Sequence, residues 1–222
     1  TGRRDPCLHR RARDRLSVLK AVLWDADGVL QQVPGGWRPL LNDLIGPERT
    51  DAFLTSLWPT AMEAMRGRGD ILVALDELFE RQGLLDVAPR IREVWGTFDR
   101  FDDTRDLVAD VRRTGIGCHL ATNQDPLRAS YMRERLGYGD LMDRSFYSCD
   151  VGAAKPDPEF FERVLEALAL PADEVAFVDD HSDNVATARA VGLQAVHWHH
   201  DEGLPTLRAA LRELGVELPE TQ

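Results

Sequence analysis

Short apolar runs alternate with amphipathic helical patterns along most of this 222-residue chain. The clearest runs are 20–24, 116–121 and 174–178, with weaker ones at 145–148 and 193–198. Helical periodicity is present at 104–114, 126–136, 159–170, 184–191 and 205–214. Alternation of this kind favours parallel strands joined by crossover helices. We therefore predict an α/β fold whose core is a Rossmann-like parallel sheet flanked by helices.

The first apolar run ends in Asp25-Ala26-Asp27-Gly28, which places two carboxylates at the carboxyl end of a strand. Open α/β sheets bind ligands at that edge. One carboxylate can attack an electrophile or hold a metal, while the other transfers a proton. Gly28 allows the backbone to turn sharply out of the strand. Asp and Gly are also ordinary turn residues, so these four residues alone leave an acidic turn as an equal alternative.

Three later segments also place polar side chains at strand ends or in loops. They are Thr122-Asn123-Gln124, the loop around Lys155, and Asp179-Asp180. Each has an ordinary structural explanation, such as a helix cap or a solvated lysine. Their order along the chain resembles the haloacid dehalogenase-like hydrolase superfamily, and the resemblance spans Leu23 to Asn184. The ordered set is far more specific than any one of its members.

The resemblance implies a Mg²⁺-dependent phosphatase. Asp25 would be the nucleophile that forms an aspartyl-phosphate, and Asp27 would be the general acid and base. Mg²⁺ would bind the Asp25 carboxylate, the Asp27 backbone carbonyl and Asp180, with Asp179 or Asp183 as an auxiliary ligand or outer contact. Such a cation is needed because a carboxylate nucleophile is repelled by a polyanionic phosphate.

The same resemblance assigns the groups that hold the phosphoryl oxygens. Thr122 and the Asn123 backbone would bind these oxygens. Lys155 would neutralise charge on the nucleophile and on the phosphoryl group, as an ammonium point charge can. We expect the substrate to be a small phosphorylated metabolite, for example a sugar phosphate.

Between Val29 and about Arg100 the pattern becomes helical throughout, and Pro59 is expected to interrupt one helix. This stretch is long for a simple βαβ crossover. The resemblance implies that it is a small all-helical cap inserted after the first strand. We predict a cap over 31–99 and a core of 19–30 and 100–222.

Substrate selectivity is expected to reside in the cap. The candidates for it are Trp37, Trp58, Met62, Arg66 and Trp95, most of which are at least as well explained as cap core. Arg66 begins a basic, glycine-containing segment and is the substrate-binding candidate, although such segments are more often solvated turns.

Rival functions remain open at this point. A phosphomutase of the same superfamily would share every residue named above. Dehalogenases of the superfamily need no metal and do not carry an aspartate two residues after the first, so Asp27 favours phosphoryl transfer. A non-catalytic binding protein that keeps the fold is a further alternative, less favoured because all matched positions are chemically competent.

Composition limits the partners that we expect. The net charge of −11 argues against nucleic-acid binding, and no apolar run approaches the ~20 residues that span a bilayer. Cys7, Cys118 and Cys149 have no metal-ligand spacing, which favours a reducing cytoplasm. Residues 1–18 are basic and are expected to form a disordered extension. The predicted partner is a small phosphorylated substrate, with no membrane and no obligate protein partner evident.

Overall fold

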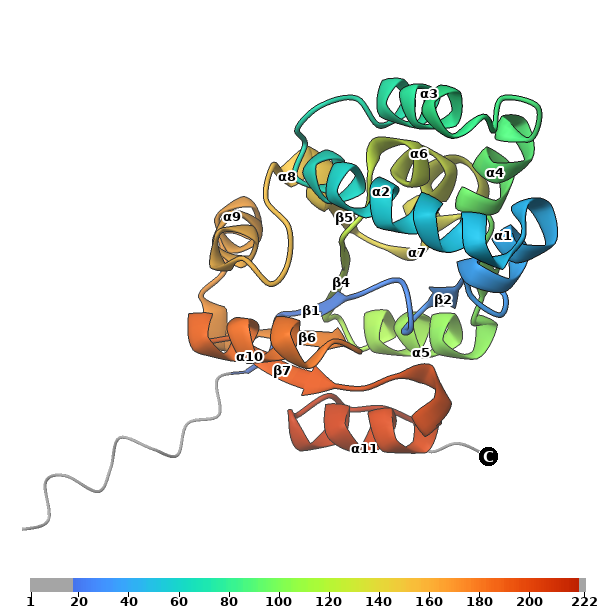
Figure 1. The fold of residues 1–222 in the computed structure, drawn as a ribbon. Coiled ribbons are helices and arrows are strands. Elements are labelled where there is room, and N and C mark those ends of the chain that lie inside the picture. The colour runs from blue at the N-terminus through green and yellow to red at the C-terminus, as the bar shows by residue number, and fades with distance from the viewer. Residues whose placement is uncertain (1–17, 220–222) are drawn as a thin grey trace, which may run out of the picture.

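A five-stranded parallel sheet forms the centre of the computed structural model, which describes residues 18–219 (Figure 1). The strands are β1 Ala21–Trp24, β4 Gly117–Thr122, β5 Arg144–Tyr147, β6 Val175–Asp179 and β7 Gln194–His197. Their order is β5-β4-β1-β6-β7, and every neighbouring pair is parallel. The predicted α/β fold with a parallel sheet is therefore confirmed. Because β1 is central, the residues after it lie between those that follow β4 and β6.

Helices cover both faces of the sheet. Ala21 and Leu23 of β1 belong to one hydrophobic cluster, whereas Val22 and Trp24 belong to the other, as the two-residue strand period requires. The first cluster contains α9 Pro158–Leu168 and α10 Ser182–Val191. The second contains α5 Asp102–Arg113, α6 Pro126–Arg135 and α11 Leu204–Glu213. These strands and helices lie within two residues of the predicted bounds.

The short elements are not evident in the sequence pattern. They are the strands β2 Gln31–Gln32 and β3 Asp99–Arg100, the helices α7 Tyr138–Leu141 and α8 Ser148–Val151, and the 3₁₀ turns at 172–174 and 200–202. A four-residue helix shows hardly one turn of periodicity, so its apolar positions cannot establish a pattern.

Four helices lie together beside the carboxyl edge of the sheet and form what we call the helical block (Figure 1). They are α1 Trp37–Ile45, α2 Pro47–Met65, α3 Ile71–Gln82 and α4 Ala88–Trp95. The block has its own hydrophobic cluster, in which Phe53 stacks on Phe79. Its two connections to the sheet run side by side, because β2 pairs with β3 in antiparallel fashion. The division into a cap at 31–99 and a core stays a prediction.

Helix α2 continues through Pro59, where the sequence predicts an interruption. Proline removes the hydrogen bond to the carbonyl four residues earlier. Both Pro59 and Thr55, which carries that carbonyl, are exposed, so water can satisfy it. Buried side chains before and after the proline, among them Leu57 and Ala61, hold both halves of the helix against the block.

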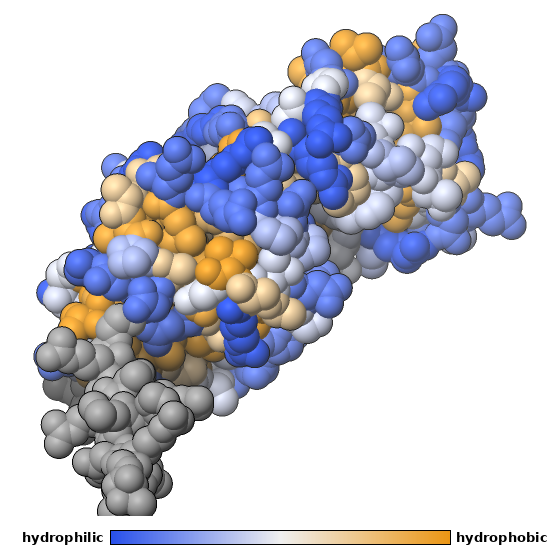
Figure 2. All heavy atoms as spheres, turned by 90° about the vertical axis from the view of Figure 1, so that its left-hand side faces the viewer, coloured by the Kyte–Doolittle hydropathy of each residue, from blue (hydrophilic) through white to orange (hydrophobic). Residues whose placement is uncertain are grey.

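The surface, the buried Cys118 and the chain end at 1–18 complete the description of the fold. Seen from the side, the molecule is elongated, and its surface mixes hydrophilic side chains with apolar groups (Figure 2). No helix in the described part of the chain has the length and apolar character to cross a membrane. Burial raises the pKa of the Cys118 thiol to about 12, as expected for an inert core cysteine. The predicted extension, residues 1–18, lies outside the described residues except for Val18.

Candidate active site

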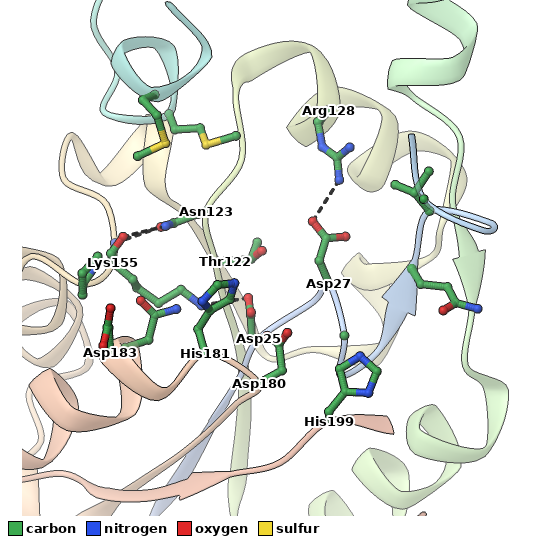
Figure 3. Close-up of a pocket in the computed structure, with 18 of the residues that line it drawn as sticks. Asp25, Asp27, Thr122, Asn123, Arg128, Lys155, Asp180, His181, Asp183 and His199 are labelled. Atoms are coloured by element: carbon green, nitrogen blue, oxygen red, sulfur yellow. Dashed lines mark hydrogen bonds and ion pairs between the residues drawn. The ribbon is translucent and has the colours of Figure 1, made fainter. Parts of the chain in front are cut away.

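Polar side chains converge in a pocket of ≈ 560 Å³ at the carboxyl ends of the central strands (Figure 3). Asp25 follows β1, Thr122 ends β4, and Asp180 follows β6. Parallel strands end at the same edge of a sheet, so residues far apart in sequence meet there. The predicted site residues that line the pocket are Asp25, Asp27, Thr122, Asn123, Lys155, Asp180 and Asp183.

Lys155 binds the first of these carboxylates directly. Its Nζ lies 2.8 Å from Oδ1 of Asp25, 2.6 Å from Oδ2 of Asp179 and 2.9 Å from the carbonyl oxygen of Ala121. The Asn123 side chain donates to the Lys155 carbonyl at 2.7 Å and accepts from its backbone N–H at 2.9 Å. All three ammonium hydrogens therefore have acceptors, and the loop that carries the ammonium is fixed to the end of β4.

Burial and charge oppose each other at this contact. Burial raises the pKa of Asp25 well above its ordinary value, Lys155 opposes that rise, and Asp179 and Asp180 add to it. Burial lowers the pKa of Lys155, but Asp179 and Asp25 more than compensate, so that the pKa is raised. The lysine is therefore a firmly protonated cation among more carboxylates than it can neutralise.

The surplus carboxylates fit a divalent cation. Oxygen atoms of Asp25, Asp179 and Asp180 all lie within 4.8 Å of one another. Burial, followed by the charge of Asp179, raises the pKa of Asp180. An all-oxygen, anionic donor set is the kind that Mg²⁺ prefers. The residues present therefore suit the cation that the sequence implies.

Asp179 and Asp180 are adjacent in sequence but differ in their position relative to the pocket. It is completely buried, and it accepts hydrogen bonds from Lys155, from the Asn184 side chain and from the His181 backbone. Asp180 lines the pocket, whereas Asp179 does not. Asp179 thus lies behind the pocket wall, where it holds Lys155.

Gly28 allows the turn that carries Asp25 and Asp27 to pack closely against Asp180. Its φ is +79°, and a Cβ at this position would lie 2.6 Å from Oδ2 of Asp180. Any other residue would therefore displace the Asp180 carboxylate or strain the backbone. The glycine lets the Asp25–Gly28 turn approach the end of β6.

Asp27 is held by three side chains to which the sequence analysis assigns no role. Its Oδ2 accepts from Arg128 at 2.9 Å and from Gln124 at 3.0 Å, and its Oδ1 accepts from Gln31 at 2.9 Å. Tyr138 in turn donates to Gln31 at 2.7 Å. These bonds fix the orientation of a carboxylate whose side chain is still 42% exposed to the pocket.

Arg128 joins this carboxylate to the helical block. Its guanidinium carbon lies 4.7 Å from the centre of the Trp37 ring and 4.2 Å from that of Phe98, and one nitrogen donates to the Trp95 carbonyl at 3.2 Å. The side chain is only 1% exposed. A sequence signal exists, because an arginine falls on the same face of the 126–136 helical pattern as Met132, where an apolar residue is expected.

The proposed selectivity residues divide into two groups. Trp37, Trp58 and Met62 line the pocket. Trp95 does not line it but stacks on Trp37, with ring centres 4.4 Å apart. Arg66 lies outside the lining as well, and its guanidinium donates to the Met62 carbonyl at 3.2 Å. Its role in substrate binding stays a prediction.

Three histidines, His197, His199 and His200, lie close together in the sequence at the end of β7. The metal-binding groups found within residues 18–219 comprise the Asp25, Asp179 and Asp180 cluster, and no histidine belongs to it. His197 contacts the Asp180 carbonyl, whereas His200 contacts Asp103. The side chains thus diverge, as expected for neighbouring residues at a strand end.

Comparison with known proteins gives one family and several relatives. The sequence profile of the haloacid dehalogenase-like hydrolases matches residues 19–192. The chain is 28% identical over 183 residues to a sesquiterpene phosphatase of Aspergillus oryzae, covering 82% of this chain and 90% of the relative. It is 24% identical over 194 residues to a phosphoglycolate phosphatase of Pectobacterium atrosepticum, covering 82% of this chain and 80% of the relative.

A solved structure shares the fold. It is that of a HAD family enzyme from Bacteroides thetaiotaomicron in complex with magnesium and inorganic phosphate. The TM-score is 0.73 at 22% identity, over 85% of this chain and 98% of the other. At this identity the likeness concerns the arrangement of strands and helices.

Proposed function

The chain belongs to the haloacid dehalogenase-like hydrolase family, and from that premise we propose that it is a Mg²⁺-dependent phosphatase using Asp25 as its nucleophile. The observation that carries the proposal is the contact of 2.8 Å between Asp25 Oδ1 and Lys155 Nζ at the floor of a pocket that Asp27 also lines. A buried carboxylate held by a cation, with a second carboxylate two residues away, suits covalent phosphoryl transfer.

In the first step a carboxylate oxygen of Asp25 attacks the phosphorus of the ester. A bond forms between that oxygen and phosphorus while the bond from phosphorus to the alcohol oxygen breaks. Asp27, in its protonated form, gives its proton to the departing oxygen, so the alcohol leaves uncharged. Lys155 and the hydroxyl of Thr122 offset the negative charge on the phosphoryl oxygens.

In the second step the same groups act in reverse. The Asp27 carboxylate takes a proton from water as the water oxygen attacks phosphorus. The bond between phosphorus and Asp25 breaks, which releases inorganic phosphate and returns Asp25 to its carboxylate and Asp27 to its protonated form. The hydrogen bonds from Arg128, Gln124 and Gln31 keep the Asp27 carboxylate in one place through both steps.

Asp25, Asp180 and the backbone carbonyl of Asp27 would hold Mg²⁺, with Asp179 behind them. The cation, when bound, supplies charge compensation and orients the phosphoryl group. The choice of cation is supported by the structural relative, which contains magnesium and inorganic phosphate. The relatives' names support a small phosphorylated substrate in general, since one names a sesquiterpene and another names phosphoglycolate.

Metal removal tests the proposal directly. With p-nitrophenyl phosphate as the substrate, exhaustive chelation should lower phosphate release at least about 100-fold, and added Mg²⁺ should restore it. Asp180→Asn should raise the Mg²⁺ concentration required for half-maximal rate. Undiminished hydrolysis after chelation would refute the metal dependence.

Arg128 offers a test of how Asp27 is held. Arg128→Met should lower kcat about 10- to 100-fold with little change in KM. The reason is that a hydrogen bond to a charged group contributes about 1.5–3 kcal/mol, and about 1.4 kcal/mol corresponds to tenfold in rate. The variant should fold, with a lower melting temperature, because the cation–π contacts are also lost.

The matched control is Arg133→Met on the same helix, whose side chain is 44% exposed and pairs with Asp150. Its kcat should be close to that of the wild type. Equal losses in the two variants would show that the effect arises from the stability of α6 and not from the orientation of Asp27.

A further inference from the structure

The walls of the active-site pocket differ in polarity. The sheet side supplies carboxylates, Lys155 and Thr122, which together account for a phosphoryl group. The helical block supplies Trp37, Trp58, Met62 and Met65, which carry large apolar side chains. The part of a substrate beyond the phosphoryl group therefore faces indole rings and thioethers.

The lysine and arginine that line the pocket are already paired. Lys155 contacts Asp25 and Asp179, and Arg128 contacts Asp27. Among the described lining residues, the helical block contributes no lysine or arginine to the pocket. His181 and His199 also line the pocket, but neither belongs to the helical block. A second phosphate or a carboxylate on the leaving group would thus lack a cation on the helical-block wall.

Trp58 leaves part of the apolar wall open to solvent. Its residue surface is 46% exposed although it lines the pocket, and its ring meets that of Trp37 edge-on, with centres 6.3 Å apart. An exposed indole is unfavourable in water unless something apolar covers it. The pocket volume of ≈ 560 Å³ lies within the range of about 300–1,000 Å³ typical of sites for drug-sized molecules, so it accommodates more than a phosphate.

We infer that the substrate is the phosphate monoester of a hydrophobic alcohol, an inference that rests on the proposed function. The phosphoryl group occupies the acidic floor, and the hydrocarbon of the alcohol packs against Trp58, Trp37 and Met62. This assignment replaces a sugar phosphate as the expected substrate, because the hydroxyls of a sugar would lose water on that wall without gaining hydrogen bonds.

A series of n-alkyl phosphates from ethyl to octyl, kept below their micellar concentrations, tests the inference. The ratio kcat/KM should rise about two- to fourfold per added methylene, and at least about 50-fold over the series. Octyl phosphate should exceed glucose 6-phosphate and 2-phosphoglycolate by a similar margin. A flat series, or a preference for the sugar or the carboxylate ester, would overturn the inference.

Variants of the apolar wall locate the effect. Trp58→Ala should lower kcat/KM for octyl phosphate about tenfold more than for ethyl phosphate, which flattens the chain-length dependence. Leu72→Ala is the control, because Leu72 is 43% exposed on the same block but does not line the pocket. Met62→Arg should raise the relative rate with 2-phosphoglycolate by supplying a cation. Identical behaviour of Trp58→Ala and Leu72→Ala would contradict the assignment.

Binding separates this inference from the proposed function. Calorimetry on the Asp25→Asn variant should give alkyl phosphate affinities that rise with chain length and a negative heat-capacity change. Chain-length-dependent binding without hydrolysis by the wild type would overturn the phosphatase proposal and retain the apolar pocket. Hydrolysis of p-nitrophenyl phosphate with no chain-length dependence in rate or binding would retain the phosphatase proposal and overturn the hydrophobic substrate.

Discussion

Replacing Asp25 with asparagine should abolish phosphate release, with a fall in kcat of at least about 10⁴-fold. The amide is a poor nucleophile, and losing the group that forms the covalent bond removes the reaction path itself, as in other enzymes with covalent intermediates. Mass spectrometry after a rapid acid quench should detect a phosphorylated Asp25 peptide in the wild type and none in the variant. A phosphorylated peptide elsewhere in the chain would refute the assignment of the nucleophile.

The variant should fold normally, which makes the loss of activity interpretable. Lys155 keeps its partner Asp179 at 2.6 Å. In the metal-free protein three carboxylates gather within 4.8 Å, so removing one charge relieves repulsion. We expect the melting temperature of Asp25→Asn to equal or exceed that of the wild type. As a control, Asp106→Asn, which removes a carboxylate from an exposed position on α5, should leave kcat unchanged.

Replacing Asp27 with asparagine should slow both chemical steps by about 10²–10⁴-fold, the usual contribution of general acid–base catalysis. The asparagine is nearly isosteric and can still accept from Arg128, so the binding of inorganic phosphate should change little. The loss should depend on the leaving group. It should be largest for alkyl phosphates, whose alcohols need a proton to depart, and smaller for p-nitrophenyl phosphate.

This leaving-group dependence separates a catalytic role from a structural one. A damaged site would slow all substrates alike, whereas a missing proton donor slows poor leaving groups most. With p-nitrophenyl phosphate the covalent intermediate should accumulate in Asp27→Asn, because its hydrolysis still lacks a base. Turnover at the wild-type rate with alkyl phosphates would refute the acid–base role and return the dehalogenase alternative to consideration.

The sequence by itself determined the sheet and the floor of the pocket. The two central runs, 21–24 and 175–178, are continuously apolar and buried, and such runs between helical patterns favour a sheet that is covered on both faces. Once the strands are parallel, their carboxyl ends share one edge, so Asp25, Thr122 and Asp180 meet there. Lys155 was assigned from its order in the motif set, and it lies within contact distance of Asp25.

Only the tertiary structure decided what surrounds that floor. The ion pair between Arg128 and Asp27 joins residues 101 positions apart, and it depends on how the helical block packs against α6. The same packing places Trp58 on the pocket wall and leaves Trp95 outside the lining, although both tryptophans fall within helical patterns of the sequence. Periodicity identifies the buried face of each element, because burial follows from local spacing. When two elements pack face to face, the packing angle and register decide which of their side chains touch. No local sequence pattern encodes that angle or register.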